Sequence, residues 1–201
     1  MFNVEIQKRW PYYNYLFTDG SKKGNNTACA VYQQYSGQQH KYKLPDEATI
    51  CTAEMMALKF ALSHALTQEM KNCVIFTDSK STVERIGLTD KSKQLSHLDI
   101  EILKLYYEIS KLGGEVIIAW IKGHSGIKGN IIADALAKEA LSSGENINNN
   151  ILPIADLDVC SKHQLRLKWQ AFRSNFGNPN FFKKDGFIQS PTEFLSKLLI
   201  D

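Results

Sequence analysis

Two aspartates follow short apolar runs that end in the same way. Asp19 follows residues 15–18 (Tyr-Leu-Phe-Thr), and Asp78 follows residues 74–77 (Val-Ile-Phe-Thr). Such runs of β-branched and aromatic residues predict buried strands, so we expect each aspartate at the point where a strand ends. Ligands of α/β sheets bind at the carboxyl ends of the strands. Two carboxylates that meet there repel each other unless a cation lies between them, which makes the pair a candidate metal site.

Two further acidic residues lie within apolar helical patterns. Glu54 begins a stripe that continues through Leu58 and Leu62, and Asp134 is the one acid in the run 131–137 (Ile-Ile-Ala-Asp-Ala-Leu-Ala). A carboxylate that faces a core is costly unless it is paired or bound to a metal. The alternatives are a first-turn glutamate favoured by the helix dipole and an aspartate on a solvated surface.

A histidine lies in a glycine-rich loop between these elements. Gly123, Gly126 and Gly129 surround His124, which indicates a mobile segment that presents an imidazole near a site; the alternative is a flexible loop with an incidental histidine. Four carboxylates at one edge of a sheet would suit Mg²⁺ or Mn²⁺. Two such ions about 4 Å apart can clamp both the attacking and the leaving oxygens of a phosphodiester displacement.

The elements that must position these residues follow from hydrophobic periodicity. We expect strands at 15–18, 28–35, 38–44, 73–77 and 115–120, and helices at 52–70, 79–87, 94–112 and 130–142. The order βββαβααβα predicts an α/β fold with a five-stranded mixed sheet and helices on both faces.

Five ordered blocks within residues 13–142 resemble the type 1 ribonuclease H domain. They are Thr18-Asp19-Gly20-Ser21, Thr52-Ala53-Glu54, Thr77-Asp78-Ser79, Gly123-His124-Ser125-Gly126 and Gly129-Asn130 with Ala133-Asp134. The resemblance implies a ribonuclease H-like fold and a metal-dependent endonuclease that hydrolyses the RNA strand of RNA–DNA hybrids with two Mg²⁺ ions, for which Mn²⁺ can substitute. Two alternatives stay open: a DDE-type polynucleotidyl transferase of the same fold, and a catalytically silent nucleic-acid-binding module.

The resemblance also implies a role for each matching residue. Asp19 would bridge both ions, Asp134 would complete the site of the attacking water, and Glu54 and Asp78 would complete the site at the leaving 3′ oxygen. His124 would assist proton movement or product release. Substrate-binding positions of the family fall on Ser21, Asn25 and Thr49. Lysines near the site are either phosphate contacts or solubility features: Lys22, Lys23, Lys80, Lys122 and Lys128.

Features outside these blocks are most similar to ribonuclease H domains of non-LTR retrotransposons. The segment between the helices expected at 79–87 and 94–112 is short, and Trp169-Gln170 matches a pair that often follows such domains. This similarity implies a reverse transcriptase domain of a parent polyprotein as a partner. We expect a monomer in the cytoplasm or nucleus.

The remaining expectations come from the composition and from the division of the chain into segments. The 201 residues are 43% hydrophobic with a net charge of +3, ordinary for a globular protein, and we see no signal peptide or spanning stretch. The four cysteines form no CxxC pair, and we expect those at 29, 51 and 73 to be buried. We expect an N-terminal arm (1–12), a catalytic domain (13–144), and a linker with a helical C-terminal extension (145–201). The extension would contain helices over 158–176 and 190–199, the first with an apolar stripe at Leu165, Trp169, Phe172 and Phe176.

Overall fold

The computed structural model describes residues 2–87, 95–147 and 152–175. The chain divides into two compact units, Met1–Pro153 and Ile154–Asp201. Every residue that the sequence assigns to chemistry belongs to the first unit.

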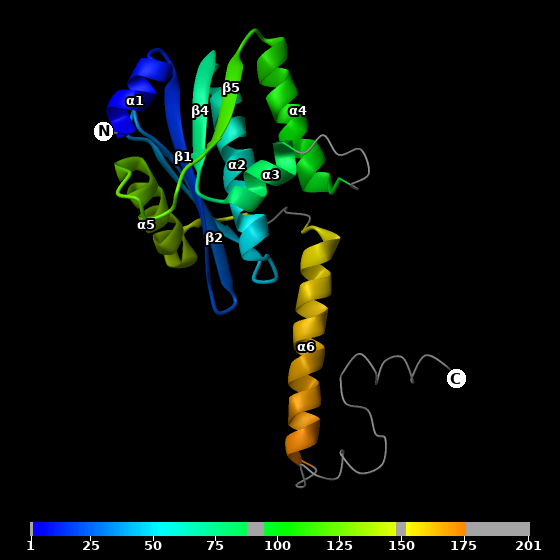
Figure 1. Ribbon diagram of the computed structural model, residues 1–201. Coiled ribbons are helices and arrows are strands. Elements are labelled where there is room, and N and C mark those ends of the chain that lie inside the picture. Colours follow the sequence, from blue (N-terminus) through cyan, green and yellow to red (C-terminus); the bar gives the residue numbers. More distant parts are fainter. Residues whose placement is uncertain (1, 88–94, 148–151, 176–201) are drawn as a thin grey trace. The chain divides into compact units, whose positions relative to one another are not determined.

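One mixed sheet lies at the centre of the first unit, and its described strands follow the order β5-β4-β1-β2-β3-β6 (Figure 1). The strands are β1 (Asn14–Lys23), β2 (Asn26–Gln33), β3 (Gln39–Leu44), β4 (Asn72–Thr77), β5 (Glu115–Trp120) and β6 (Glu145–Asn146). The pairs β1–β2 and β2–β3 are antiparallel, whereas β1–β4, β3–β6 and β4–β5 are parallel. The predicted mixed sheet is confirmed.

Two details of the sheet differ from the prediction. A sixth strand, β6, lies where we expected only a linker, and it pairs with Tyr42 and Lys43 of β3. Two polar residues carry no apolar alternation, so backbone pairing alone creates this strand. In addition, β1 continues to Lys23 in a long hairpin with β2. Asp19 therefore lies inside a strand and not at its end, although the β1–β4 pairing does stop at Thr18 and Thr77.

Helices cover both faces of the sheet. They are α1 (Phe2–Arg9), α2 (Ile50–Thr67), α3 (Lys80–Gly87), α4 (His97–Lys111) and α5 (Lys128–Ser143). Successive side chains of a strand point to opposite faces: Leu16 packs in the cluster formed with α2 and α4, and Phe17 packs in the cluster that includes residues of α1 and α5. The helices expected between residues 52 and 142 are present, with ends shifted by a few residues.

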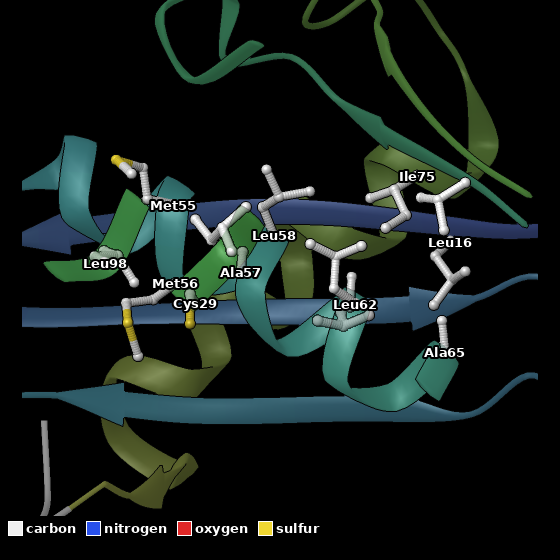
Figure 2. Close-up of a cluster of buried hydrophobic side chains, with 14 of the residues drawn as sticks. Leu16, Cys29, Met55, Met56, Ala57, Leu58, Leu62, Ala65, Ile75 and Leu98 are labelled. Atoms are coloured by element: carbon white, nitrogen blue, oxygen red, sulfur yellow. The ribbon is translucent and has the colours of Figure 1, made fainter. Parts of the chain in front are cut away.

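The larger core lies between α2 and the sheet (Figure 2). Small residues on α2, such as Ala57 and Ala61, are fully buried and let the helix lie close to the strands. Leu58 and Leu62 fill the remaining space against Leu16 and its neighbours. The stripe predicted to follow Glu54 therefore faces the core, which directs the start of α2 toward the sheet.

The segment expected to be an N-terminal arm contains α1, which contributes to the second core. Ile6 is buried, and the rings of Phe2 and Trp10 lie edge-on to Phe76 at centroid distances of 5.6 and 6.3 Å. Cys29 and Cys73 are buried as expected, but Cys51 is exposed because it lies in the first turn of α2 on its outer side.

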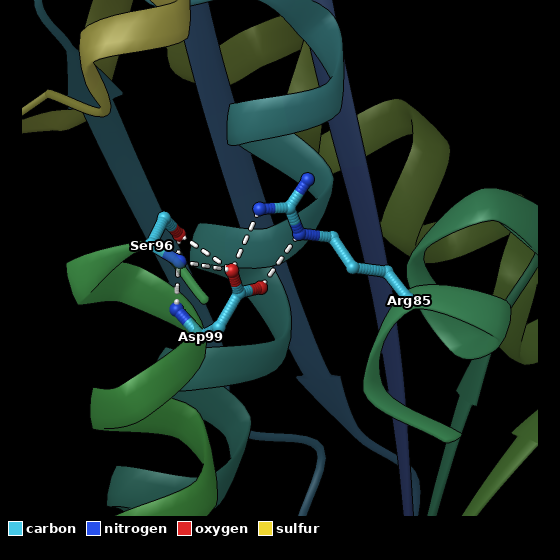
Figure 3. Close-up of polar contacts among 3 residues, drawn as sticks. All are labelled: Arg85, Ser96 and Asp99. Atoms are coloured by element: carbon cyan, nitrogen blue, oxygen red, sulfur yellow. Dashed lines mark hydrogen bonds and ion pairs between the residues drawn. The ribbon is translucent and has the colours of Figure 1, made fainter. Parts of the chain in front are cut away.

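An ion pair joins α3 to the start of α4 (Figure 3). Arg85 Nε and Nη2 each donate to one carboxylate oxygen of Asp99 at 2.6 Å, and the Ser96 hydroxyl donates to the same carboxylate at 2.7 Å. Burial alone would raise the pKa of Asp99, but these hydrogen bonds outweigh it and the pKa is lowered. The reciprocal capping box of Ser96 and Asp99 fixes where α4 begins.

The described part of the second unit is helix α6 (Ile154–Asn175). The helix predicted over 158–176 is thus confirmed as helical, starting four residues earlier. Phe176 and the helix predicted at 190–199 lie outside the described residues, and the packing of the apolar stripe stays a prediction. Among the described helices, none is both long and apolar enough to cross a membrane.

We expect Gly129→Ala to destabilise the fold. A Cβ at this position would lie 2.3 Å from the Phe17 ring, so α5 would have to move away from β1, at a cost of about 1–3 kcal/mol. Urea denaturation measures the free energy of unfolding. The matched control is Gly87→Ala, because a Cβ there meets no atom of the described residues within 4 Å. Equal stabilities of the two variants would contradict the close approach of α5.

Candidate active site

Three carboxylates from separate elements meet at one edge of the sheet. Asp19 lies on β1, Glu54 on α2 and Asp78 directly after β4, and each offers an oxygen within 4.8 Å of the others. The parallel register pairs Thr18 with Thr77, so the next residue of each strand is one of the two aspartates. The sequence prediction that these three acids converge agrees with this geometry.

Glu54 reaches the aspartates because α2 begins very close to β1. A Cβ on Gly20 would lie 2.9 Å from the backbone nitrogen of Glu54, so only glycine leaves room for this approach. Thr49 sets the start of the helix: its hydroxyl accepts a hydrogen bond from the Thr52 backbone N–H at 3.2 Å. Glu54 then lies in the second turn, beyond the residues that fray.

The electrostatics of the site favour the protonated forms of Asp19 and Glu54 in the absence of a cation. Burial, with the charges of Asp78 and Asp134, raises the pKa of Asp19 to about 8, although Lys138 acts in the opposite direction. Burial also raises the pKa of Glu54 to about 9, with contributions from Asp19 and Asp78, against a hydrogen bond from the Gly20 backbone. A bound cation would remove this penalty, because it favours the ionised form of each acid.

The donor set fits a hard divalent cation. Asp19 is only 6% exposed, and Glu54 Oε2 is buried without a hydrogen-bond partner among the described residues. A buried carboxylate oxygen without a hydrogen-bond partner costs stability unless a bound ligand interacts with it. Oxygen ligands of this kind are those that Mg²⁺ and Mn²⁺ prefer. The three acids are thus suited to hold such an ion.

Asp134 lies apart from the group of three. It is on α5, where its carboxylate accepts from Lys138 Nζ at 2.8 Å, one helical turn away. Its charge nevertheless contributes to the raised pKa of Asp19, so the two carboxylates are near enough to repel each other. Three of the four predicted carboxylates thus lie within 4.8 Å of one another, and the fourth, Asp134, makes an ion pair with Lys138.

The last residue of β5, and the loop and helix that follow it, contact Asp78. The Trp120 indole N–H donates to the Asp78 backbone carbonyl at 3.0 Å, and the Asn130 amide donates to Asp78 Oδ2 at 3.2 Å. A Cβ on Gly123 would lie 2.8 Å from the same oxygen. Sequence reasoning assigned no role to Trp120 or Asn130, although Asn130 stands in one of the matching blocks. The one available signal was their proximity in sequence to the glycine-rich loop.

The remaining predicted residues lie on the loop after β5, on the β1–β2 hairpin and at the start of α2. His124 is exposed and has a left-handed backbone with φ of 54°, next to Gly123. Ser21 is half-buried on β1, Asn25 is exposed in the turn between β1 and β2, and Thr49 caps α2. The substrate-binding roles of these last three residues stay predictions.

Two of the nearby lysines have partners within the protein. Lys22 Nζ donates to the backbone carbonyls of Asp46 and Ala48, which holds the loop before α2. Lys80 pairs with Glu84 at 3.4 Å on the exposed side of α3. The other three, Lys23, Lys122 and Lys128, are exposed. Lys22 thus has a structural role in addition to its charge.

Comparison with known proteins places this site in a family. A family model described as RNase H matches residues 12–142. Ribonuclease H1 of Rattus norvegicus is 30% identical over 146 residues, which are 65% of this chain and 50% of that protein. Ribonuclease H of Dichelobacter nodosus is 29% identical over 140 residues, which are 64% of this chain and 91% of that protein. The matched region therefore spans about half the length of the mammalian relative.

A solved structure, RNase H1 from the halophilic archaeon Halobacterium salinarum, aligns with a TM-score of 0.46 and 24% identity over 64% of this chain and 97% of that one. The family match extends over more than half of the chain, from the strand that carries Asp19 to the helix that carries Asp134. The chain therefore belongs to the RNase H family.

Proposed function

We propose that this protein is an endonuclease that hydrolyses the RNA strand of RNA–DNA hybrids with the help of divalent cations. The observation that carries the proposal is the group of three carboxylates in a chain of the RNase H family. Relatives named ribonuclease H match this same region, and for the bacterial ones it covers most of their length.

Asp19, Glu54 and Asp78 would hold the cation, and Asp134 would complete the site from α5. When two divalent cations are bound, they supply a clamp for the attacking and leaving oxygens of the phosphodiester. The protein contributes fixed positions: Asp19 comes from the pairing of β1 with β4, and Glu54 from the close approach of α2. His124, exposed on its loop, would move a proton or assist release of the product.

Selectivity for RNA is expected to come from the shape of the hybrid and from 2′-hydroxyl contacts, since cleavage needs no reading of base edges. Ser21, Asn25 and Thr49 are our candidates for these contacts. Ser21 lies two residues after Asp19 on β1, Asn25 lies in the turn between β1 and β2, and Thr49 lies directly before α2. Exposed Lys23, beside Asn25, would attract the phosphates.

The test is cleavage of an end-labelled RNA–DNA hybrid, compared with double-stranded RNA and double-stranded DNA, each with Mg²⁺ and with EDTA. We expect Mg²⁺-dependent cuts in the RNA strand alone, leaving 5′-phosphate ends. Joining of strands would instead indicate a polynucleotidyl transferase. Binding of the hybrid with no cleavage would indicate a silent binding module.

We further propose that the chain derives from a non-LTR retrotransposon and works beside a reverse transcriptase domain. Trp169-Gln170, now placed on α6, and the short connection between α3 and α4 support this origin. We expect the encoding reading frame to continue into a reverse transcriptase. We also expect a monomer by light scattering, and a cytoplasmic or nuclear location. A transcript that encodes these residues without any polymerase would contradict the origin.

We expect Asp19→Asn to abolish cleavage and to leave hybrid binding intact or stronger. The change removes a ligand shared by the proposed ions and one negative charge that faces the phosphates. Gel assays measure cleavage and fluorescence anisotropy in EDTA measures binding. Asp46→Asn, which alters an exposed acid outside the group of three, is the control. Substantial turnover by Asp19→Asn at saturating Mg²⁺ would refute the assignment.

His124→Ala should slow turnover less than the loss of an acid, because the carboxylates still hold the cations. General acid–base assistance is typically worth about 10²–10⁴-fold. Comparing single-turnover with multiple-turnover rates separates two roles for His124. A larger loss in multiple turnover indicates product release, whereas an equal loss in both places His124 in the chemical step. A rate equal to wild type in both would remove His124 from the mechanism.

Stability without metal should fall as the pH rises. Asp19 and Glu54 have pKa values of about 8 and about 9 in the folded chain, against about 4 when unfolded. The folded chain thus binds more protons at these two acids, so their contribution to stability is fully present below about pH 4 and is lost as the pH rises through their folded pKa values.

Urea denaturation at several pH values between about 5 and 9 measures this slope, which follows from the linkage of proton binding to folding. In EDTA, Asp19→Asn should flatten it. Mg²⁺ should also reduce the slope, because the ion binds the ionised acids and therefore stabilises the fold most at alkaline pH. A wild-type profile in EDTA that is level or rises with pH would count against the buried, repelling carboxylates.

A further inference from the structure

Asp78 differs from the other two acids of the group in how it is held. Asp19 and Glu54 are fixed by a strand interior and a helix, but Asp78 is the first residue after β4. Regular backbone pairing ends at Thr77, so neighbouring side chains must fix its carboxylate. The Asn130 amide donates to the carboxylate, and the Trp120 indole donates to the backbone carbonyl of the same residue.

The orientation of Asn130 follows from its contact with Asp78. A carboxylate oxygen accepts hydrogen bonds, so the nitrogen of the amide must face Asp78 Oδ2, at 3.2 Å. The amide oxygen, Oδ1, then points elsewhere, and it is buried with no partner among the described residues. Asn130 itself is only 5% exposed. A buried amide with an unmet acceptor is a cost to the fold that calls for an explanation.

Capping of α5 does not supply that explanation. Asn130 is the third residue of α5, and the residue at the N-cap, Ile127, makes no side-chain hydrogen bond to the helix. The described contact of the Asn130 side chain runs across to Asp78, 52 positions away in the sequence. The close contact of Gly129 with Phe17 fixes the first turn of α5 against β1, and thereby fixes where the Asn130 amide can reach.

We propose that Asn130 is a positioning residue that orients the Asp78 carboxylate for divalent-cation binding. This inference rests on the proposed function in that it takes the three acids as the cation site. The Asn130 amide donates to one oxygen of Asp78 and so fixes the plane of the carboxylate.

The test compares Asn130→Leu and Asn130→Ala with the wild-type chain. Leucine keeps the number of side-chain heavy atoms and the branching of asparagine but removes both the donor and the unmet acceptor, whereas alanine removes most of the side chain as well. Isothermal titration calorimetry with MgCl₂, without any nucleic acid, measures the cation affinity directly. We expect both variants to bind Mg²⁺ about 10–100-fold more weakly, as is typical when a partner of a metal ligand is lost.

Two further readouts separate positioning from a structural role. The melting temperature of Asn130→Leu in EDTA should equal or exceed that of the wild type, because a buried unmet acceptor is removed. Affinity for the hybrid in EDTA should change less than twofold, so that loss of cleavage appears in the Mg²⁺ requirement and not in KM. A structural role would lower the melting temperature and the Mg²⁺ affinity together.

The matched control is Asn14→Leu, which removes an amide that donates to the Asn72 carbonyl at 3.3 Å, at the opposite end of the β1–β4 pair. It should leave Mg²⁺ affinity unchanged. The proposal is overturned if both Asn130 variants bind Mg²⁺ like the wild type, or if Asn14→Leu weakens binding equally. A wild-type chain that binds Mg²⁺ but cuts no hybrid would refute the proposed function alone. Failure of the wild type to bind Mg²⁺ would refute both.

Discussion

Mutual repulsion among partly buried carboxylates is the constraint to which the rest of this structure responds. Asp19, Glu54 and Asp78 lie within 4.8 Å of one another, where burial and like charge raise the pKa values of the first two by several units. Such an arrangement costs stability without a cation. A preformed cation site explains this cost: packing elsewhere holds the acids together, so that the ligands are already in place when a cation binds.

That packing uses close approaches at glycine on both faces of the sheet. Gly20 lets the backbone of α2 come against β1 and so delivers Glu54 from one face. Gly129 lets α5 come against Phe17 and so delivers Asn130 and Asp134 from the other. Because each glycine is beside a site residue in the chain, the contact that fixes the helix also fixes the carboxylate or amide. The contacts that hold these helices against the sheet therefore also position the residues of the site.

The sequence predicted the elements and the acids better than their exact geometry. Apolar runs located β4 and β5 almost to the residue, because buried strands carry strong local patterns. The sixth strand had no such pattern, since two polar residues of β6 pair only through their backbone. Asp19 was expected at a strand end, but β1 continues as a hairpin, and only the β1–β4 pairing ends there. Pairing partners are non-local, and local patterns do not report them.

The contacts of single side chains were beyond sequence reasoning for a related reason. The ion pair of Asp134 with Lys138 follows from a four-residue helical spacing that is visible in the sequence. How close this ion pair lies to the other carboxylates depends on the position of α5. Asn130 and Trp120 contact Asp78 only because β5 runs parallel to β4 and ends beside it. Family resemblance could name the acids, since their types carry the chemistry. The groups that orient those acids become visible only when the two strand ends are placed next to each other.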